Sequence, residues 1–148
     1  QPYSGNQGFG FWENGSNGSW GTLQFLIAPG GSVYATGDVY SSYSDIRLKD
    51  VVGYIEDPIT LLKKIETFYY EPNETAIKLG ATSGRRVGVS AQSVKEVQPE
   101  VIGQSTLGED YMTVQYERLV PLLIESVKKQ QEQIEQLKAE IEELKRNK

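Results

Sequence analysis

Residues 120–144 read VPLLIESVKKQQEQIEQLKAEIEEL. Apolar side chains recur there every three or four residues, with Glu, Lys and Gln between them. This heptad spacing is typical of a parallel coiled coil formed by copies of one chain. The stripe of a and d positions, called the heptad stripe below, comprises Val120, Leu123, Val127, Gln130, Ile134, Leu137, Ile141 and Leu144.

The same helix could instead dock on its own domain, but a stripe of a and d positions alone is narrow for that use. Ile at a with Leu at d favours two strands, whereas Gln130 at d and valines at a weaken that preference. Dimer and trimer therefore both remain open from the heptads. Pro121 predicts a kink or a restart near the beginning of the helix.

The composition excludes several classes of chemistry. The chain has 148 residues, a net charge of −5, and no Cys or His. These absences exclude disulfides, thiol catalysis and a Ser-His-Asp triad, and no metal or cofactor is predicted. The net negative charge argues against nucleic acid as a partner. The sequence contains no 18-residue apolar run, so no membrane span is expected.

A sharp change in composition predicts a domain boundary near residue 43. Residues 1–43 contain no Lys or Arg, yet they hold 9 of the 15 glycines and 9 of the 15 aromatic residues. We expect three parts: a β-rich segment over 1–43, an α+β body over 44–112, and a coiled-coil helix over 113–148. The fold class is therefore α+β with a long C-terminal helix.

Within the first part, aromatic and β-branched runs predict strands at residues 8–12, 20–27 and 32–40. Asn-Gly and Pro-Gly-Gly sequences between them are turn signals. So few residues cannot cover their own aromatic side chains. The segment is either a disordered Gly-rich leader or the end of a β-rich body, continued upstream or completed by copies of itself.

The middle part alternates helix and strand signals. Asp57 as N-cap with Pro58 at the first helical position predicts a helix start. A strand is expected at residues 68–70, a loop or hairpin over 77–86, and a strand at 86–89. Ser90 is a candidate cap for a helix that ends before Pro99.

Without His or Cys, nucleophilic catalysis needs Ser or Thr activated by another base. The compact candidate is Ser44-Asp45-Ile46-Arg47-Leu48-Lys49, at the composition boundary. A neutral lysine can take the proton of a serine hydroxyl. Serine followed five residues later by lysine is also what a simple polar turn contains, so the pattern by itself leaves both interpretations open.

The chain resembles a known family at four ordered places. Together they resemble the intramolecular chaperone domain that ends phage endosialidase tail spikes, L-shaped tail fibres and neck appendages. The order and spacing of the motifs cover essentially all of 44–148. The motifs are residues 44–49, residues 58–65 with 68–70, residues 87–94 with 99–101, and residues 112–128.

This resemblance implies a homotrimer that helps the upstream β-rich fibre of the same chain to fold and then releases itself. The family's serine falls on Ser44 and its lysine on Lys49, as a catalytic dyad. The scissile bond falls between Tyr43 and Ser44. Asp45 and Arg47 match the motif, but the match assigns them no role. Assembly would take place in the host cytoplasm, with residues 1–43 retained in the virion fibre.

Three functional hypotheses follow. The first is a self-cleaving trimeric chaperone, a serine peptidase that turns over once in cis. The second is a non-catalytic trimerisation or fibre-tip module with an inert serine. The third is a regulatory coiled-coil adaptor unrelated to phage, and the fibre-like leader argues against it.

Overall fold

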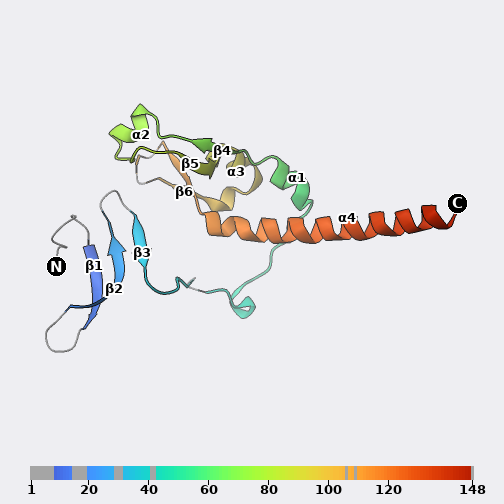
Figure 1. Ribbon diagram of the computed structural model, residues 1–148, viewed down its shortest axis with the longest axis horizontal. Coiled ribbons are helices and arrows are strands. Elements are labelled where there is room, and N and C mark those ends of the chain that lie inside the picture. The colour runs from blue at the N-terminus through green and yellow to red at the C-terminus, as the bar shows by residue number, and fades with distance from the viewer. Residues whose placement is uncertain are drawn as a thin grey trace. The chain divides into compact units, whose positions relative to one another are not determined.

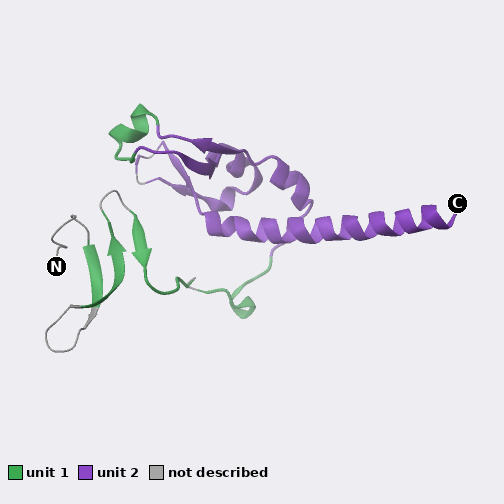
Figure 2. Ribbon diagram, viewed as in Figure 1, with its two compact units in different colours: residues 1–51, 73–82 green, residues 52–72, 83–148 purple. Residues whose placement is uncertain are grey.

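The computed structural model divides the chain into two compact units (Figure 2). Unit 1 comprises residues 1–51 and 73–82, and unit 2 comprises residues 52–72 and 83–148. The turn signals expected near residues 15–18 and 29–31 lie outside the described residues. The structure describes residues 9–14, 20–28, 32–40, 43–105, 107–108 and 110–147.

Unit 1 contains an antiparallel three-stranded sheet in the order β1-β2-β3 (Figure 1). Its strands are β1 (Phe9–Asn14), β2 (Trp20–Ile27) and β3 (Val33–Ala35). The β-rich interpretation of this segment is therefore confirmed for the described strands. The strand expected over 32–40 is wrong beyond Ala35, because the chain bends at residues 36–37.

Aromatic rings line one face of this sheet. Phe9 and Phe11 are two residues apart on β1, so they share one face of the sheet. Their rings contact each other edge to face, with centroids 5.0 Å apart. Phe11 pairs with Phe25 on β2, with centroids 6.2 Å apart. Phe9 and Phe11 are 53% and 56% exposed, so unit 1 leaves this apolar face uncovered. Gly10 faces the other way, where an added Cβ would come within 2.8 Å of the Trp12 ring.

Two short helices also lie in the described residues of unit 1. The first is the 3-10 helix η2 (Ile46–Leu48), which lies inside the motif Ser44–Lys49, called the Ser-to-Lys motif below. The second is α2 (Glu74–Lys78), capped by Asn73, whose Oδ1 accepts from the Ala76 N–H at 2.9 Å. The loop or hairpin expected over 77–86 is thus partly wrong, because the Asn73 cap carries a helical turn to Lys78.

Unit 2 combines short helices with two small antiparallel sheets (Figure 1). One sheet pairs β4 with β5 and the other pairs β6 with β7. The hairpin of β6 and β7 carried no sequence prediction. In chain order the elements are α1 (Pro58–Lys63), β4 (Thr67–Tyr70), β5 (Arg86–Val89), α3 (Ala91–Val97), η3 (Pro99–Val101), β6 (Ile102–Gln104), β7 (Met112–Val114), η4 (Tyr116–Leu119) and α4 (Val120–Arg146).

The buried core of unit 2 is small. It centres on Val94 of α3, Val101 of η3 and Leu119 of η4. Partly buried apolar side chains surround these three: Ile65, Val89, Ile102 and Val114. So small a core supplies limited stabilisation from apolar burial.

The two predicted helix caps in this region had different outcomes. Ser90 caps α3 as expected, because its side chain accepts from the Ser93 N–H. Asp57 occupies the N-cap position of α1, but its side chain makes no capping hydrogen bond. Its φ of 45° places the residue in the left-handed region, so a side-chain cap at Asp57 was wrong.

The long helix α4 begins where the sequence predicted a restart. The chain turns through η4 and then enters α4 at Val120, so Pro121 lies in the first helical turn. A missing N–H costs nothing there, because the first N–H groups of a helix have no partner within it. Leu122 and Ser126 are buried against the body of unit 2, and the Ser126 hydroxyl lies 3.2 Å from the Pro58 carbonyl oxygen.

Candidate functional site

The residues of the Ser-to-Lys motif meet on one turn of unit 1. Lys49 Nζ donates a long hydrogen bond of 3.4 Å to Ser44 Oγ. The two side chains are thus within reach of a direct proton transfer, and catalytic contacts of this length commonly tighten in a reacting complex. The structure brings together the pair that the resemblance identified.

Local hydrogen bonds shape this turn. Asp45 caps η2, because its Oδ1 accepts from the Arg47 N–H at 2.9 Å. Leu48 N–H donates to the Asp45 carbonyl, and Lys49 N–H donates to the Ile46 carbonyl, each at 3.1 Å. The path from Ser44 to Lys49 is therefore a tight turn, which is what lets Lys49 Nζ approach Ser44 Oγ.

Asp45 and Arg47 form an ion pair on the same turn. Arg47 Nε donates to both carboxylate oxygens of Asp45, at 3.0 and 3.1 Å. The Arg47 side chain and backbone N–H lower the pKa of Asp45, and the positive charge of Lys49 adds to this effect. The same hydrogen bonding raises the pKa of Arg47. The sequence identified both residues as members of the motif but did not predict that they bind one another.

The peptide bond between Tyr43 and Ser44 lies at an exposed position. The Tyr43 side chain is 62% exposed, and Ser44 and Lys49 are exposed as well. A serine whose hydroxyl lies one residue from the carbonyl that it attacks has proximity built into the covalent chain. The arrangement can support attack by Ser44 Oγ on the Tyr43 carbonyl, assisted by Lys49.

The second candidate site is the heptad stripe of α4. All eight positions lie on this helix, and every one of them is exposed. The apolar members include Val127 at 63% and Leu144 at 66%. Leu122 and Ser126, which directly precede Leu123 and Val127 in the sequence, lie on the other face of the helix and are buried. The body of unit 2 therefore covers one face of α4 and leaves the heptad stripe uncovered.

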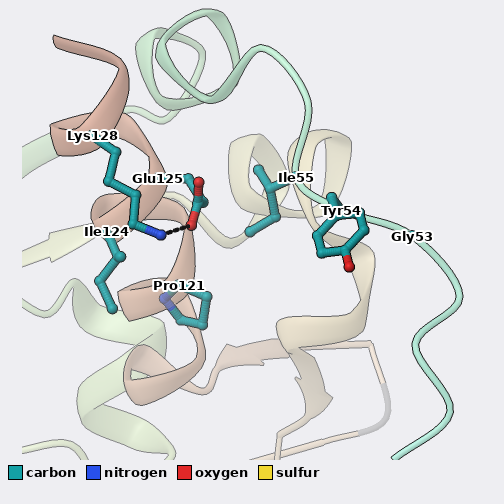
Figure 3. Close-up of a pocket in the computed structure, with 7 residues that line it drawn as sticks. All are labelled: Gly53, Tyr54, Ile55, Pro121, Ile124, Glu125 and Lys128. Atoms are coloured by element: carbon teal, nitrogen blue, oxygen red, sulfur yellow. Dashed lines mark hydrogen bonds and ion pairs between the residues drawn. The ribbon is translucent and has the colours of Figure 1, made fainter. Parts of the chain in front are cut away.

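An open groove flanks the first turns of α4 (Figure 3). Tyr54 and Ile55 lie across it from Pro121 and Ile124. An ion pair of 2.7 Å between Lys128 Nζ and Glu125 Oε1 borders it. Because Ile124 follows Leu123 of the heptad stripe, the exposed apolar surface at the start of α4 is wider than the stripe alone.

Sequence reasoning missed Ser126, which ties α4 to α1. Its hydroxyl lies 2.8 Å from the Leu122 carbonyl and 3.2 Å from that of Pro58, and it is buried. A small hydroxyl residue within a helix is the available signal, but its partner Pro58 lies 68 residues away in sequence. No local pattern identifies such a partner.

These features define a class of protein: a small α+β module that carries a long helix with an exposed heptad stripe and has a serine–lysine turn at its boundary. None of the helices in the described part of the chain has the length and apolar character needed to cross a bilayer.

Residues 44–103 match the model of the Peptidase_S74 family, described as "Chaperone of endosialidase". The resemblance drawn from the sequence is thereby confirmed, and the family supports an intramolecular chaperone role. The match begins at Ser44 and ends before α4. No curated protein matches the chain.

Proposed function

We propose that the chain assembles a homotrimer through α4, helps its upstream β-rich part to fold, and then cuts its own Tyr43–Ser44 bond. Assembly takes place in the host cytoplasm, and residues 1–43 stay with a phage tail fibre or appendage after release. The observation that carries the proposal is the 3.4 Å contact between Lys49 Nζ and Ser44 Oγ, at the residue where the family match begins.

The cleavage step follows from this pair of side chains. Neutral Lys49 takes the Ser44 hydroxyl proton as Ser44 Oγ attacks the Tyr43 carbonyl carbon. The Tyr43–Ser44 C–N bond breaks, and the Ser44 nitrogen receives a proton and becomes a free amine. This N-to-O shift leaves an ester between Tyr43 and the Ser44 oxygen. Water then hydrolyses the ester to the Tyr43 carboxylate and the Ser44 hydroxyl.

The heptad stripe and the junction at residues 43–49 are both exposed in the single chain, and we expect assembly to change that. The exposed heptad stripe is apolar in seven of its eight positions and would be buried between parallel helices. The junction at residues 43–49 is exposed in the single chain, where water competes for every polar contact. Cleavage also needs donors for the developing oxyanion. We therefore expect cleavage to follow assembly, as a checkpoint on correct folding.

Cleavage also gives the fibre kinetic stability. Once the chaperone has left, the fibre has lost the pathway by which it assembled, so its unfolding becomes harder to reverse but slower to begin. Cut and uncut fibre should therefore unfold at different rates. Equal rates would remove this part of the proposal.

The direct test compares the wild-type chain with Ser44→Ala by denaturing mass analysis. We expect wild type to give pieces 1–43 and 44–148, while Ser44→Ala stays whole and forms the same oligomer. Ser41→Ala is a matched control, because it removes the hydroxyl of a serine three residues earlier in the sequence and keeps Ser44. If wild type and Ser44→Ala both stay whole as trimers, the chain is the non-catalytic trimerisation module instead.

A further inference from the structure

The distance between Ser44 and Lys49 depends on the turn between them. Five residues of extended chain span about 17 Å, which a lysine side chain cannot bridge. A 3-10 helix rises only about 2.0 Å per residue. Because η2 occupies residues 46–48, it brings Lys49 Nζ back to 3.4 Å from Ser44 Oγ.

Asp45 holds this turn from its N-terminal end. Its side chain accepts from the Arg47 N–H at 2.9 Å and its carbonyl accepts from the Leu48 N–H at 3.1 Å. A helix of three residues has little stability of its own, so a side-chain cap is a large share of what maintains it. Apart from the Asp45–Arg47 ion pair, the other described hydrogen bonds of η2 are backbone bonds of the same turn.

Arg47 is the cationic partner of the Asp45 carboxylate. Its Nε donates to both oxygens, so the carboxylate has a close cationic partner. An unpaired carboxylate on this turn would compete with Ser44 for the ammonium group of Lys49. In the structure Lys49 bonds to Ser44 instead.

We infer that Asp45 is a positioning residue for the Ser44–Lys49 pair, acting through the turn that it caps, and that Arg47 keeps the Asp45 carboxylate from binding Lys49. This inference rests on the proposed self-cleavage and gives a role to the two motif residues that the resemblance left unassigned. Neither residue exchanges a proton or a bond with the reacting atoms.

The test uses the full chain with Asp45→Ala and Asp45→Asn. Asparagine keeps a side-chain oxygen that can cap the turn, whereas alanine removes it. We expect Asp45→Ala to slow self-cleavage by about fivefold to tenfold, the scale of a lost cap, while Asp45→Asn stays within about twofold of wild type. Oligomer mass should be the same for all three chains. A wild-type rate in Asp45→Ala, or equal slowing in both variants, would overturn the capping role.

Arg47→Gln tests the second part. It keeps the backbone N–H that Asp45 binds but removes the guanidinium, so the freed carboxylate can bind Lys49. We expect slower cleavage in Arg47→Gln and recovery in Arg47→Gln with Asp45→Asn, where no carboxylate remains. An unchanged rate in the single variant, or no recovery in the double variant, would overturn this part.

A measurement independent of cleavage separates this inference from the proposed function. Backbone NMR of the uncut Ser44→Ala chain reports directly whether residues 46–48 keep their turn. We expect the turn to be lost on adding Asp45→Ala and kept on adding Asp45→Asn. If wild type never cleaves, the proposed function fails, and this comparison still decides whether Asp45 holds the turn. A turn that survives Asp45→Ala would overturn the inference even in a chain that cleaves.

Discussion

The junction at residues 43–49 and the first turns of α4 differ in how far along the chain their contacts reach. In the junction, the longest described side-chain contact joins residues five apart, from Lys49 to Ser44. In α4, Ser126 reaches Pro58 across 68 residues and is buried. The junction can therefore form its turn wherever the local sequence is intact, whereas the anchoring of α4 requires unit 2 to be folded.

Under the proposed function, the residues that react and the helix surface that controls when they react therefore lie in different parts of the chain. A locally formed serine–lysine turn is exposed, and exposed polar contacts are weak because water competes for them. A helix anchored on one face and uncovered on the other presents a fixed surface to other copies. Under the proposed function, assembly through that surface decides when the exposed junction reacts. The following predictions would break or sharpen this comparison, from the largest expected effect to the smallest.

Under the proposed function, replacing the proposed base Lys49 should have the largest effect, and that effect should be confined to the junction. Lys49→Arg keeps the positive charge but cannot become neutral, so it cannot accept the Ser44 proton. We expect cleavage to fall by more than about a thousandfold, with oligomerisation unchanged, as measured by denaturing mass analysis and sedimentation. Lys145→Arg, at an exposed position of α4, is the matched control and should cleave normally. Cleavage by Lys49→Arg at the wild-type rate would exclude Lys49 as the base.

A charge in the heptad stripe should disrupt assembly first and cleavage as a consequence. Ile134→Asp would place one carboxylate from each copy in the same layer of the coil. We expect a loss of roughly 3–5 kcal/mol in association free energy, seen by sedimentation as a shift toward single chains. Gln136→Asp, off the stripe on the same helix, is the control. Normal cleavage by a dissociated Ile134→Asp chain would show that the junction acts without assembly.

Two neighbouring leucines allow the two faces of α4 to be compared directly. Leu122 is 0% exposed, whereas Leu123 is 47% exposed in the single chain. We expect Leu122→Ala to lower the free energy of unfolding of unit 2 by about 2–5 kcal/mol, because it leaves a cavity. Leu123→Ala should leave the stability of the dilute chain nearly unchanged and weaken association instead. Thermal unfolding and sedimentation across a concentration series measure the two effects, and identical behaviour of the variants would contradict the assignment of faces.

The smallest effect concerns the titration of Asp45. Hydrogen bonds from Arg47 hold the pKa of Asp45 below its ordinary value of 3.8. A lowered pKa means that the carboxylate stabilises the turn above the unfolded-state pKa, and that this stabilisation is lost as the pH falls through the folded-state pKa. An NMR titration of the Asp45 carboxyl should therefore give a midpoint below 3.8, and Arg47→Gln should raise it. A midpoint that is the same in both chains would mean that the ion pair does not persist in solution.

Local signals predicted a good part of the fold. The Ser90 cap, β5 and the restart before α4 agree with the sequence, because each depends on residues close together in the chain. The helix start at Pro58 also agrees, but the side-chain cap expected at Asp57 is absent, because the backbone of Asp57 adopts the left-handed region. Sequence reasoning also missed the β6–β7 hairpin, because three-residue strands carry too little periodicity to be recognised.

The sequence by itself determined the heptad stripe, the composition boundary and the motif that ends at Lys49, because all three are patterns of nearby residues. It also carried the resemblance to the chaperone family whose model matches residues 44–103. Only the structure decided that Asp45 binds Arg47 while Lys49 turns to Ser44, and that Leu122 and Ser126 anchor α4. The first is a choice among neighbours within one motif, and it depends on the backbone path of the turn. The second is tertiary, because the burial of one face of α4 depends on partners such as Pro58, which lies 68 residues from Ser126 in the sequence.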